Sequence, residues 1–121
     1  MLAVRNRFME AVEMVRAGRY FDAHEAFETL WREAEGPDRE YYRGWVLLSA
    51  ALFHRDRGNP TGSRLCFERA AAHWQKLPAR VRGTPLAETL KAFETVLERE
   101  WVKPDLSFVA PVLGGAPSET D

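Results

Sequence analysis

The segment from Tyr41 to His54, which reads YYRGWVLLSAALFH, limits what this chain can fold into more than any other part of it. On a helical wheel its apolar side chains leave almost no polar face, which is typical of a helix buried on all sides. A helix that spans a bilayer needs roughly 20 apolar residues, and this run is shorter and has charged residues at both ends. We therefore expect it to be the central helix of a soluble, all-α bundle.

Apolar residues at helical spacing predict four further helices around this segment. The first should run from Leu2 to Arg16 and end at Gly18, because a glycine just past a helix can adopt the left-handed cap conformation. The other boundaries follow from capping residues, glycines and prolines. Asp22 opens the second helix and Gly36-Pro37 ends it; the central helix runs from near Asp38 to Gly58; Asn59-Pro60 and Leu77-Pro78 bound the fourth; Thr84-Pro85 opens the fifth, whose buried stripe should include Trp101.

At 121 residues the chain has room for one domain and a tail. We expect the helical domain to cover residues 1–102. The composition changes from Lys103 onward, where prolines and glycines break any helix, so residues 103–121 should form an irregular, partly disordered tail. Its apolar residues could dock on the same bundle or on a second subunit: Leu106, Phe108, Val109, Val112 and Leu113.

Sliding the chain along itself by forty positions shows an internal repeat, in which Gly18 falls on Gly58 and Phe27 on Phe67. The first two helices and the next two therefore look like two copies of one helical hairpin, with the fifth helix as a lid. The spacing Gly18-x-Tyr20-x-x-Ala23-x-x-x-Phe27 resembles half of a tetratricopeptide unit. Two hairpins are fewer than the three repeats a solenoid usually needs, so a compact bundle is expected.

Charge and cysteine content narrow the possible functions. The single cysteine, Cys66, excludes an internal disulfide and a cysteine-rich metal knuckle. Charged residues inside the first apolar pattern do not fit a signal peptide, so we expect a cytoplasmic protein. The net charge of −1 implies no polyanionic partner for the whole molecule, although residues 55–82 are basic enough to make weak nucleic-acid binding an alternative to a solvated helix face. The basic residues are Arg55, Arg57, Arg64, Arg69, Lys76, Arg80 and Arg82, against Asp56 and Glu68.

The densest candidate for a site is the stretch FDAHEAFETLWR, which begins at Phe21. His24 and Glu28 are one helical turn apart and project from one face. This spacing suits a pair of metal ligands, and it suits a plain imidazole–carboxylate hydrogen bond equally well. A third ligand must come from elsewhere, and His54 is the obvious candidate, because antiparallel packing should bring His24, Glu28, His54 and Asn59 to one end of the bundle.

Other residues of the motif have structural explanations. Asp22 and Glu25 have the spacing of a capping box. Trp31 continues the buried stripe of its helix, and it stays a ligand-binding candidate because it shares the motif with His24. Cys66 and His73 are expected on the buried side of the fourth helix, and no residue has the context of a catalytic nucleophile.

The same segment, with the glycine-bearing central helix and the turn that follows it, resembles a family of small bacterial and archaeal proteins, domain of unknown function 309. The resemblance implies a compact helical bundle, gives Gly44 and Gly58 structural roles, and implies no reaction. The chain departs from the family pattern at Phe27, where tryptophan is common, and at Arg43 and Leu47, where glutamines often stand. The matching positions are Ala23, His24, Glu25, Phe27, Glu28, Trp31, Gly44, Ala51, His54, Gly58, Asn59 and Gly62.

We therefore expect a non-enzymatic module that binds an unknown protein partner or self-associates, with a homodimer as one form. It should need no cofactor, no catalytic residue and no membrane. The alternative is a small metal-binding protein or hydrolase-like enzyme centred on His24, Glu28 and His54. A weak nucleic-acid binder is the further alternative.

Overall fold

The computed structural model describes the backbone of residues 2–109 and the side chains of residues 6–109. Nearly all of the regular structure is helical, as the sequence predicts. The elements are α1 (Leu2–Arg16), α2 (Tyr20–Glu33), α3 (Pro37–Asp56), α4 (Pro60–Trp74), β1 (Arg80–Val81), β2 (Thr84–Pro85) and α5 (Leu86–Val96). The two strands form a small antiparallel pair between α4 and α5.

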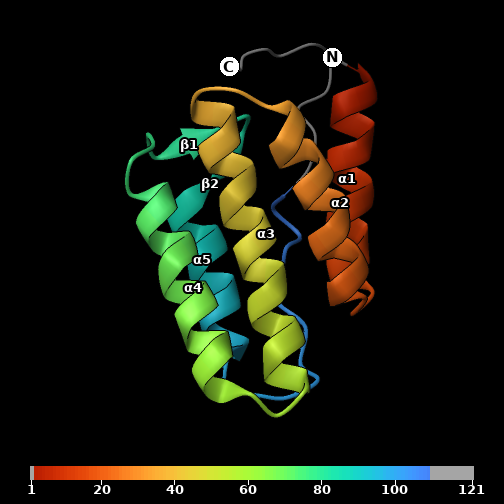
Figure 1. The fold of residues 1–121 in the computed structure, drawn as a ribbon, viewed down its shortest axis with the longest axis vertical. Helices are drawn as coiled ribbons and strands as arrows, with labels where there is room; N and C mark the ends of the chain where they lie inside the picture. Colours follow the sequence, from red (N-terminus) through yellow and green to blue (C-terminus); the bar gives the residue numbers. More distant parts are fainter. Residues whose placement is uncertain (1, 110–121) are drawn as a thin grey trace.

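The helices form two layers, and α3 is the middle helix of the nearer one (Figure 1). α3 packs against α2 on one side and against α4 on the other. In the view of Figure 1 these three helices make the nearer layer, whose outer side we call the front face, while α5 lies behind α4 and the segment after α5 runs behind α3. The chain is thus a bundle of two successive hairpins followed by a helix, the architecture predicted from the sequence.

The central helix is buried as its composition predicts. Tyr41, Trp45, Leu48 and Leu52 are each 0% exposed. Trp45 is the centre of an aromatic cluster that joins every helix, since its ring lies 5.5 Å from Phe8, 5.1 Å from Phe27, 5.9 Å from Trp74 and 5.9 Å from Phe93. Edge-on and offset ring pairs of this kind add about 0.5–1.5 kcal/mol each beyond burial. This cluster therefore packs the central helix against each of the other four helices.

The helix ends show which capping predictions hold. Asn59 caps α4 as predicted, accepting a 2.9 Å hydrogen bond from the Gly62 amide. The predicted capping box of Asp22 and Glu25 is wrong, because α2 begins two residues earlier and its cap residue makes no side-chain hydrogen bond. The Glu25 amide therefore lies inside the helix, and Asp22 pairs with Arg19 instead, 3.1 Å away.

The fifth helix also begins differently from the prediction. Thr84 and Pro85 are strand β2 and not a capping pair, and α5 starts only at Leu86, without a side-chain cap. The Thr84 hydroxyl instead accepts a hydrogen bond of 2.7 Å from the Tyr41 hydroxyl in the core. Burial raises the pKa of Tyr41 well above its ordinary value, so this phenol stays a donor.

The segment after α5 has no helix or strand from Lys103 to Val109 and packs on the bundle. Leu106 and Val109 are each 1% exposed, and the carbonyl oxygens of both accept hydrogen bonds from the Arg16 guanidinium. Trp101 was predicted to be buried, and this is wrong: α5 ends at Val96, so Trp101 leaves the helical stripe and is 70% exposed. The predicted docking residues Val112 and Leu113 lie outside the described residues.

The membrane prediction can be compared with the helices that the structure describes. None of these helices is long and apolar enough to cross a bilayer.

Candidate functional site

The front face carries a pocket between the start of α2 and the second half of α3. The pocket has a volume of about 190 Å³ and is lined by Phe21, His24, Ala50, Phe53 and His54. Its aromatic rings are close together, with the Phe21 ring 5.4 Å from Phe53 and 5.9 Å from His24. Antiparallel packing of α2 on α3 thus brings the two candidate histidines to one site, which we call the histidine pocket.

The two histidines differ in their hydrogen bonds. The His24 Nδ1 atom is buried and has no hydrogen-bond partner in the described structure. His54 Nδ1 lies 3.5 Å from the Asn59 side-chain nitrogen, which belongs to the same residue that caps α4. The His54 ring thus has a polar neighbour in Asn59, while His24 keeps a hydrogen-bonding atom without a partner among the described residues.

Glu28 does not join this pocket. Its carboxylate lies 3.4 Å from the Arg32 guanidinium, one turn further along α2. Among the residues whose side chains are described, no three His, Cys, Asp or Glu side chains converge in a way that could hold a metal ion. The arrangement of His24, Glu28 and His54 is thus two imidazoles in an apolar pocket and a separate surface ion pair.

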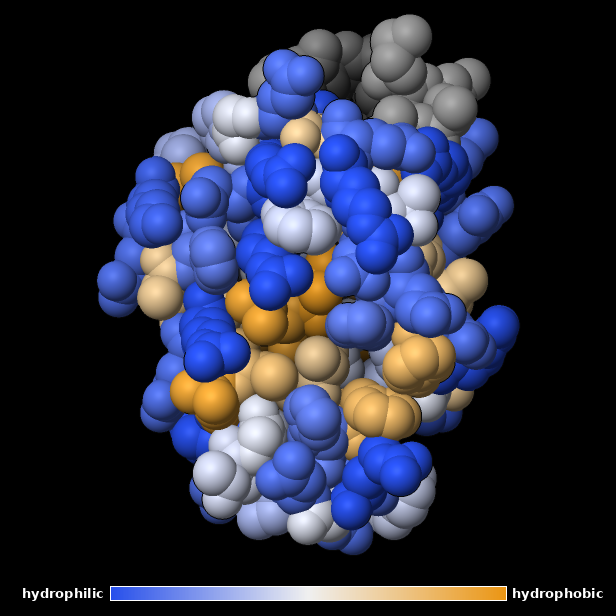
Figure 2. All heavy atoms as spheres, viewed as in Figure 1, coloured by the Kyte–Doolittle hydropathy of each residue, from blue (hydrophilic) through white to orange (hydrophobic). Residues whose placement is uncertain are grey.

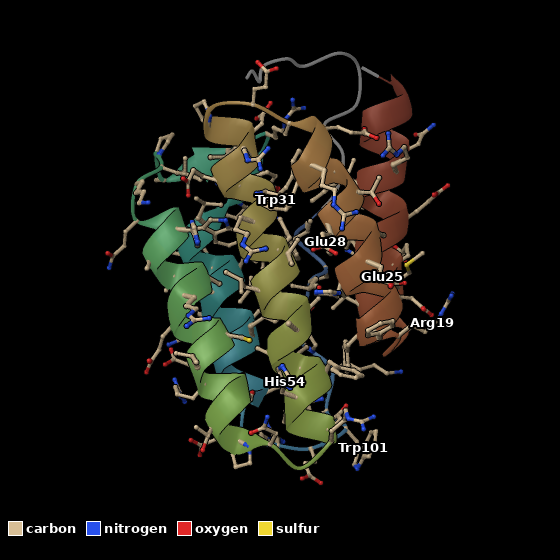
Figure 3. All side chains as sticks on the ribbon, viewed as in Figure 1. Arg19, Glu25, Glu28, Trp31, His54 and Trp101 are labelled. Atoms are coloured by element: carbon tan, nitrogen blue, oxygen red, sulfur yellow. The ribbon has the colours of Figure 1, made fainter. Side chains whose placement is uncertain are left out.

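Trp31 lies at the other end of the same face, where α3 begins (Figure 3). Two arginines of α3 stack on its ring: Arg39 Cζ lies 4.4 Å and Arg43 Cζ 4.9 Å from the ring centroid. Trp31 is only half-buried, which differs from the fully buried position expected from its stripe. We call this group of three the arginine–tryptophan cluster.

The arginine–tryptophan cluster borders a second hollow of about 200 Å³, which Glu40 and His73 also line. Glu40 Oε1 lies 2.6 Å from His73 Nδ1, and Glu40 Oε2 lies 3.9 Å from Lys76 Nζ. The hydrogen bond from His73 lowers the pKa of Glu40 below its ordinary value. His73 is therefore a half-exposed partner of Glu40, and not the buried residue predicted for α4.

Cys66 lies on α4 and is partly buried against the core. Burial raises the pKa of its thiol, and the nearby charges of Arg69 and Arg43 oppose that shift. The thiol is therefore protonated and unreactive at neutral pH.

The basic stretch from residue 55 to residue 82 is not one solvated patch. Arg55 is 3% exposed, which corrects its assignment to the surface. Three others face carboxylates, since Arg64 lies 3.6 Å from Glu94 and from Glu98, Lys76 reaches Glu40, and Arg82 lies 2.7 Å from Asp38. Internal pairing thus neutralises much of the charge that suggested nucleic-acid binding.

Sequence reasoning missed the arginine–tryptophan cluster and the Glu40–His73 pair. A signal for the first was present. Trp31 lies a few residues before Gly36, and Arg39 and Arg43 lie a few residues after it. An antiparallel hairpin that turns at Gly36 therefore places Trp31 beside the two arginines. No comparable local signal links Glu40 to His73, because their contact depends on the register between α3 and α4.

Comparison with known proteins places this all-α, two-hairpin chain in a family. Residues 8–65 match the family described as domain of unknown function 309. The matched segment runs from α1 to the first turns of α4 and includes the histidine pocket and the arginine–tryptophan cluster. The chain belongs to this family, as the motif beginning at Phe21 predicts.

Two relatives illustrate the similarity. The uncharacterized protein YpuF of Bacillus subtilis (strain 168) is 35% identical over 54 residues, which are 44% of this chain and 31% of that protein. The chain therefore matches less than a third of the length of this relative. The crystal structure of a conserved hypothetical protein from Thermus thermophilus has a TM-score of 0.66 at 35% identity, covering 74% of this chain and 93% of the other.

Proposed function

We propose that this protein is a non-enzymatic binding module that holds a partner polypeptide on its front face. The observation that carries the proposal is the histidine pocket, in which Phe21 remains 48% exposed. Protein interfaces concentrate their binding energy in central pockets that take an apolar or aromatic side chain. A pocket of about 190 Å³ with aromatic walls suits one such side chain.

The surface around the pocket supports this function. Figure 2 shows apolar side chains gathered over the middle of the front face, with hydrophilic residues around them. Leu47 and Ala50 lie on one face of α3 between Arg43 and His54, at the three- and four-residue spacing of a helical stripe. An apolar centre with a polar rim is the usual anatomy of a protein interface.

The chemistry of the pocket favours binding over catalysis. Its lining contains no carboxylate, hydroxyl or thiol among the described side chains, so neither histidine there has a nucleophile to activate. The imidazole rings of His24 and His54 instead form part of the pocket wall, against which a bound segment can pack. The histidines would then orient a bound segment and would not transfer protons.

Selection from a library of randomised peptides about 14 residues long, displayed on phage, tests this function; at 1.5 Å per residue such a peptide can follow most of α3. The selections use the whole chain, as wild type and as Ala50→Glu, which places a charge in the pocket. Ala87→Glu, which adds the same charge at an exposed site on α5, is the control. We expect peptides that bind wild type and the control equally and bind Ala50→Glu at least about tenfold more weakly, a difference of about 1.4 kcal/mol. The proposal would be overturned if no peptide were enriched, or if the enriched peptides bound Ala50→Glu as tightly as wild type.

A further inference from the structure

The arginine–tryptophan cluster is a second binding feature of the front face, and it is charged. Among the described side chains, no carboxylate lies within 4.0 Å of the Arg39 or Arg43 guanidinium, although other arginines near them are paired. The nearest acidic neighbour in the hollow, Glu40, already faces His73 and Lys76. Both guanidiniums are therefore available to a partner.

Stacking on Trp31 prepares these arginines for binding. A guanidinium held over an indole ring gains roughly 0.5–1 kcal/mol at an exposed site, and its N–H groups stay free around the rim of the ring. The planar guanidinium group of arginine binds a carboxylate through two parallel hydrogen bonds, and a guanidinium already held in place loses little conformational freedom when the carboxylate binds. The two arginines, one helical turn apart on α3, therefore define a binding site for acidic side chains.

We propose, on the basis of the binding function above, that the partner is an acidic amphipathic helix that places an apolar side chain in the histidine pocket and carboxylates on Arg39 and Arg43. The helix lies along α3, in the groove mode in which anchors repeat every three, four or seven residues. The histidine pocket thus recognises the apolar anchor, and the arginine–tryptophan cluster on the same face recognises the acidic groups.

The length of α3 sets the spacing of these groups in the partner. Arg43 is seven residues before Ala50, and Arg39 is eleven residues before it. At 1.5 Å per residue these separations are about 10 Å and about 16 Å along the axis. A bound helix should therefore carry acidic residues about seven and eleven positions from its apolar anchor.

Charge also distinguishes this partner from a second copy of the chain. Two front faces packed with their α3 helices parallel would set Arg39 and Arg43 close to the same residues of the other copy, and like charges facing one another are unfavourable. With the helices antiparallel, the two arginines would face the histidine pocket of the other copy, whose lining has no carboxylate. An acidic partner removes the repulsion and adds attraction, so complementarity favours it over self-association.

The peptides from the selection described above test this inference. We expect those that depend on Ala50 to be enriched in Asp and Glu seven and eleven positions from an apolar anchor. The variant Arg39→Gln/Arg43→Gln should bind them about tenfold or more weakly, while Lys91→Gln, which removes one charge from exposed α5, should not. Added salt should weaken binding to wild type more than to the double variant.

The outcomes separate the two proposals. Pocket-dependent peptides without an acidic excess, or with equal affinity for Arg39→Gln/Arg43→Gln, would overturn the acidic partner and leave the binding function standing. If no selected peptide bound wild type more tightly than Ala50→Glu, the binding function itself would be overturned. A stable dimer in sedimentation that Ala50→Glu dissociates would identify a second copy as the occupant of the front face and so overturn the acidic partner.

Discussion

The indole ring of Trp74 in α4 lies directly against Gly44 in α3. A Cβ atom on Gly44 would lie 2.0 Å from Trp74 Nε1, far inside van der Waals contact. The same nitrogen donates a hydrogen bond of 3.0 Å to the Tyr41 carbonyl oxygen. Gly44 thus lets α4 approach the central helix closely enough for a tryptophan to hydrogen-bond to its backbone, and the seam below the front face depends on this contact.

Gly44→Ala should destabilise the protein although alanine is the better helix former. Alanine gains about 1 kcal/mol of helix propensity, but forcing a methyl group into this packed contact displaces the indole, breaks its hydrogen bond and adds strain of about 1–3 kcal/mol. We expect a net loss of about 1–2 kcal/mol in the free energy of unfolding, measured with urea.

Trp74→Phe provides the control for this substitution, because a phenyl ring is smaller and makes no hydrogen bond to Tyr41. The cost of Gly44→Ala should be much lower in the Trp74→Phe background than in wild type. An equal cost in both backgrounds would show that the indole contact is not the cause.

Arg55 is the buried cation that holds the segment after α5. Its Nη1 donates to the carbonyl oxygens of Val96 at 2.9 Å and Val102 at 2.7 Å, and its Nε lies 2.7 Å from Asp56 Oδ1. Arg55→Met removes the side-chain donor of two carbonyls and leaves the nearly buried Asp56 carboxylate with only the Trp101 amide as a partner, so unfolding by urea should become easier by about 3–5 kcal/mol. The matched change Arg57→Met, on an exposed neighbour, should cost no more than about 0.5 kcal/mol; equal losses would contradict the role of Arg55.

The Glu40–His73 pair predicts a dependence of stability on pH. The folded pKa of Glu40 is lowered below the ordinary value of 4.5, so the pair contributes fully above that pH and is lost as the pH falls through the lower folded value. Glu40→Gln should lower the melting temperature at about pH 6, and the difference from wild type should shrink as the pH falls below 4.5 and Glu40 becomes protonated. A difference that persists at the acidic end would mean that the Glu40 charge is not what stabilises the pair.

Trp101 has an unusual backbone conformation for a residue with a side chain. Its φ angle is 70°, in the left-handed region, and its side chain is 70% exposed. Glycine relieves about 1–2 kcal/mol of this strain and costs about 0.5–1 kcal/mol in chain freedom. Trp101→Gly should therefore leave thermal stability unchanged or raise it by up to about 1 kcal/mol. A clear loss of stability would show that the indole packs on the protein.

The sequence predicts the helices well because their signals are local. The apolar segment that begins at Tyr41 has no polar face, and burial on all sides follows from that alone. Asn59-Pro60 marks the start of α4 because an asparagine cap and a proline at the first helical position act within one turn. Asp22 and Thr84 had equally good capping chemistry, but the ends of α2 and α5 are set by packing against α1 and by the pairing of β1 with β2.

Only those residues of the candidate site that stand out in the local sequence could be predicted. The histidines stand out by residue type, and the antiparallel hairpin brings them to one end. The burial of Arg55 could not be predicted, because its partners include carbonyl groups about forty residues away, whose positions depend on how the segment after α5 folds back. The availability of Arg39 and Arg43 likewise depends on where Glu40 points, which the α3–α4 register decides.

Amide chemical-shift mapping of the nitrogen-15-labelled protein with the tightest peptide from the selection shows where a partner binds. The shifts should be concentrated along the front face, at His24, Ala50 and His54 for the pocket and at Trp31, Arg39 and Arg43 for the charged site. Shifts centred on α1 or α5, or none along α3, would contradict this prediction.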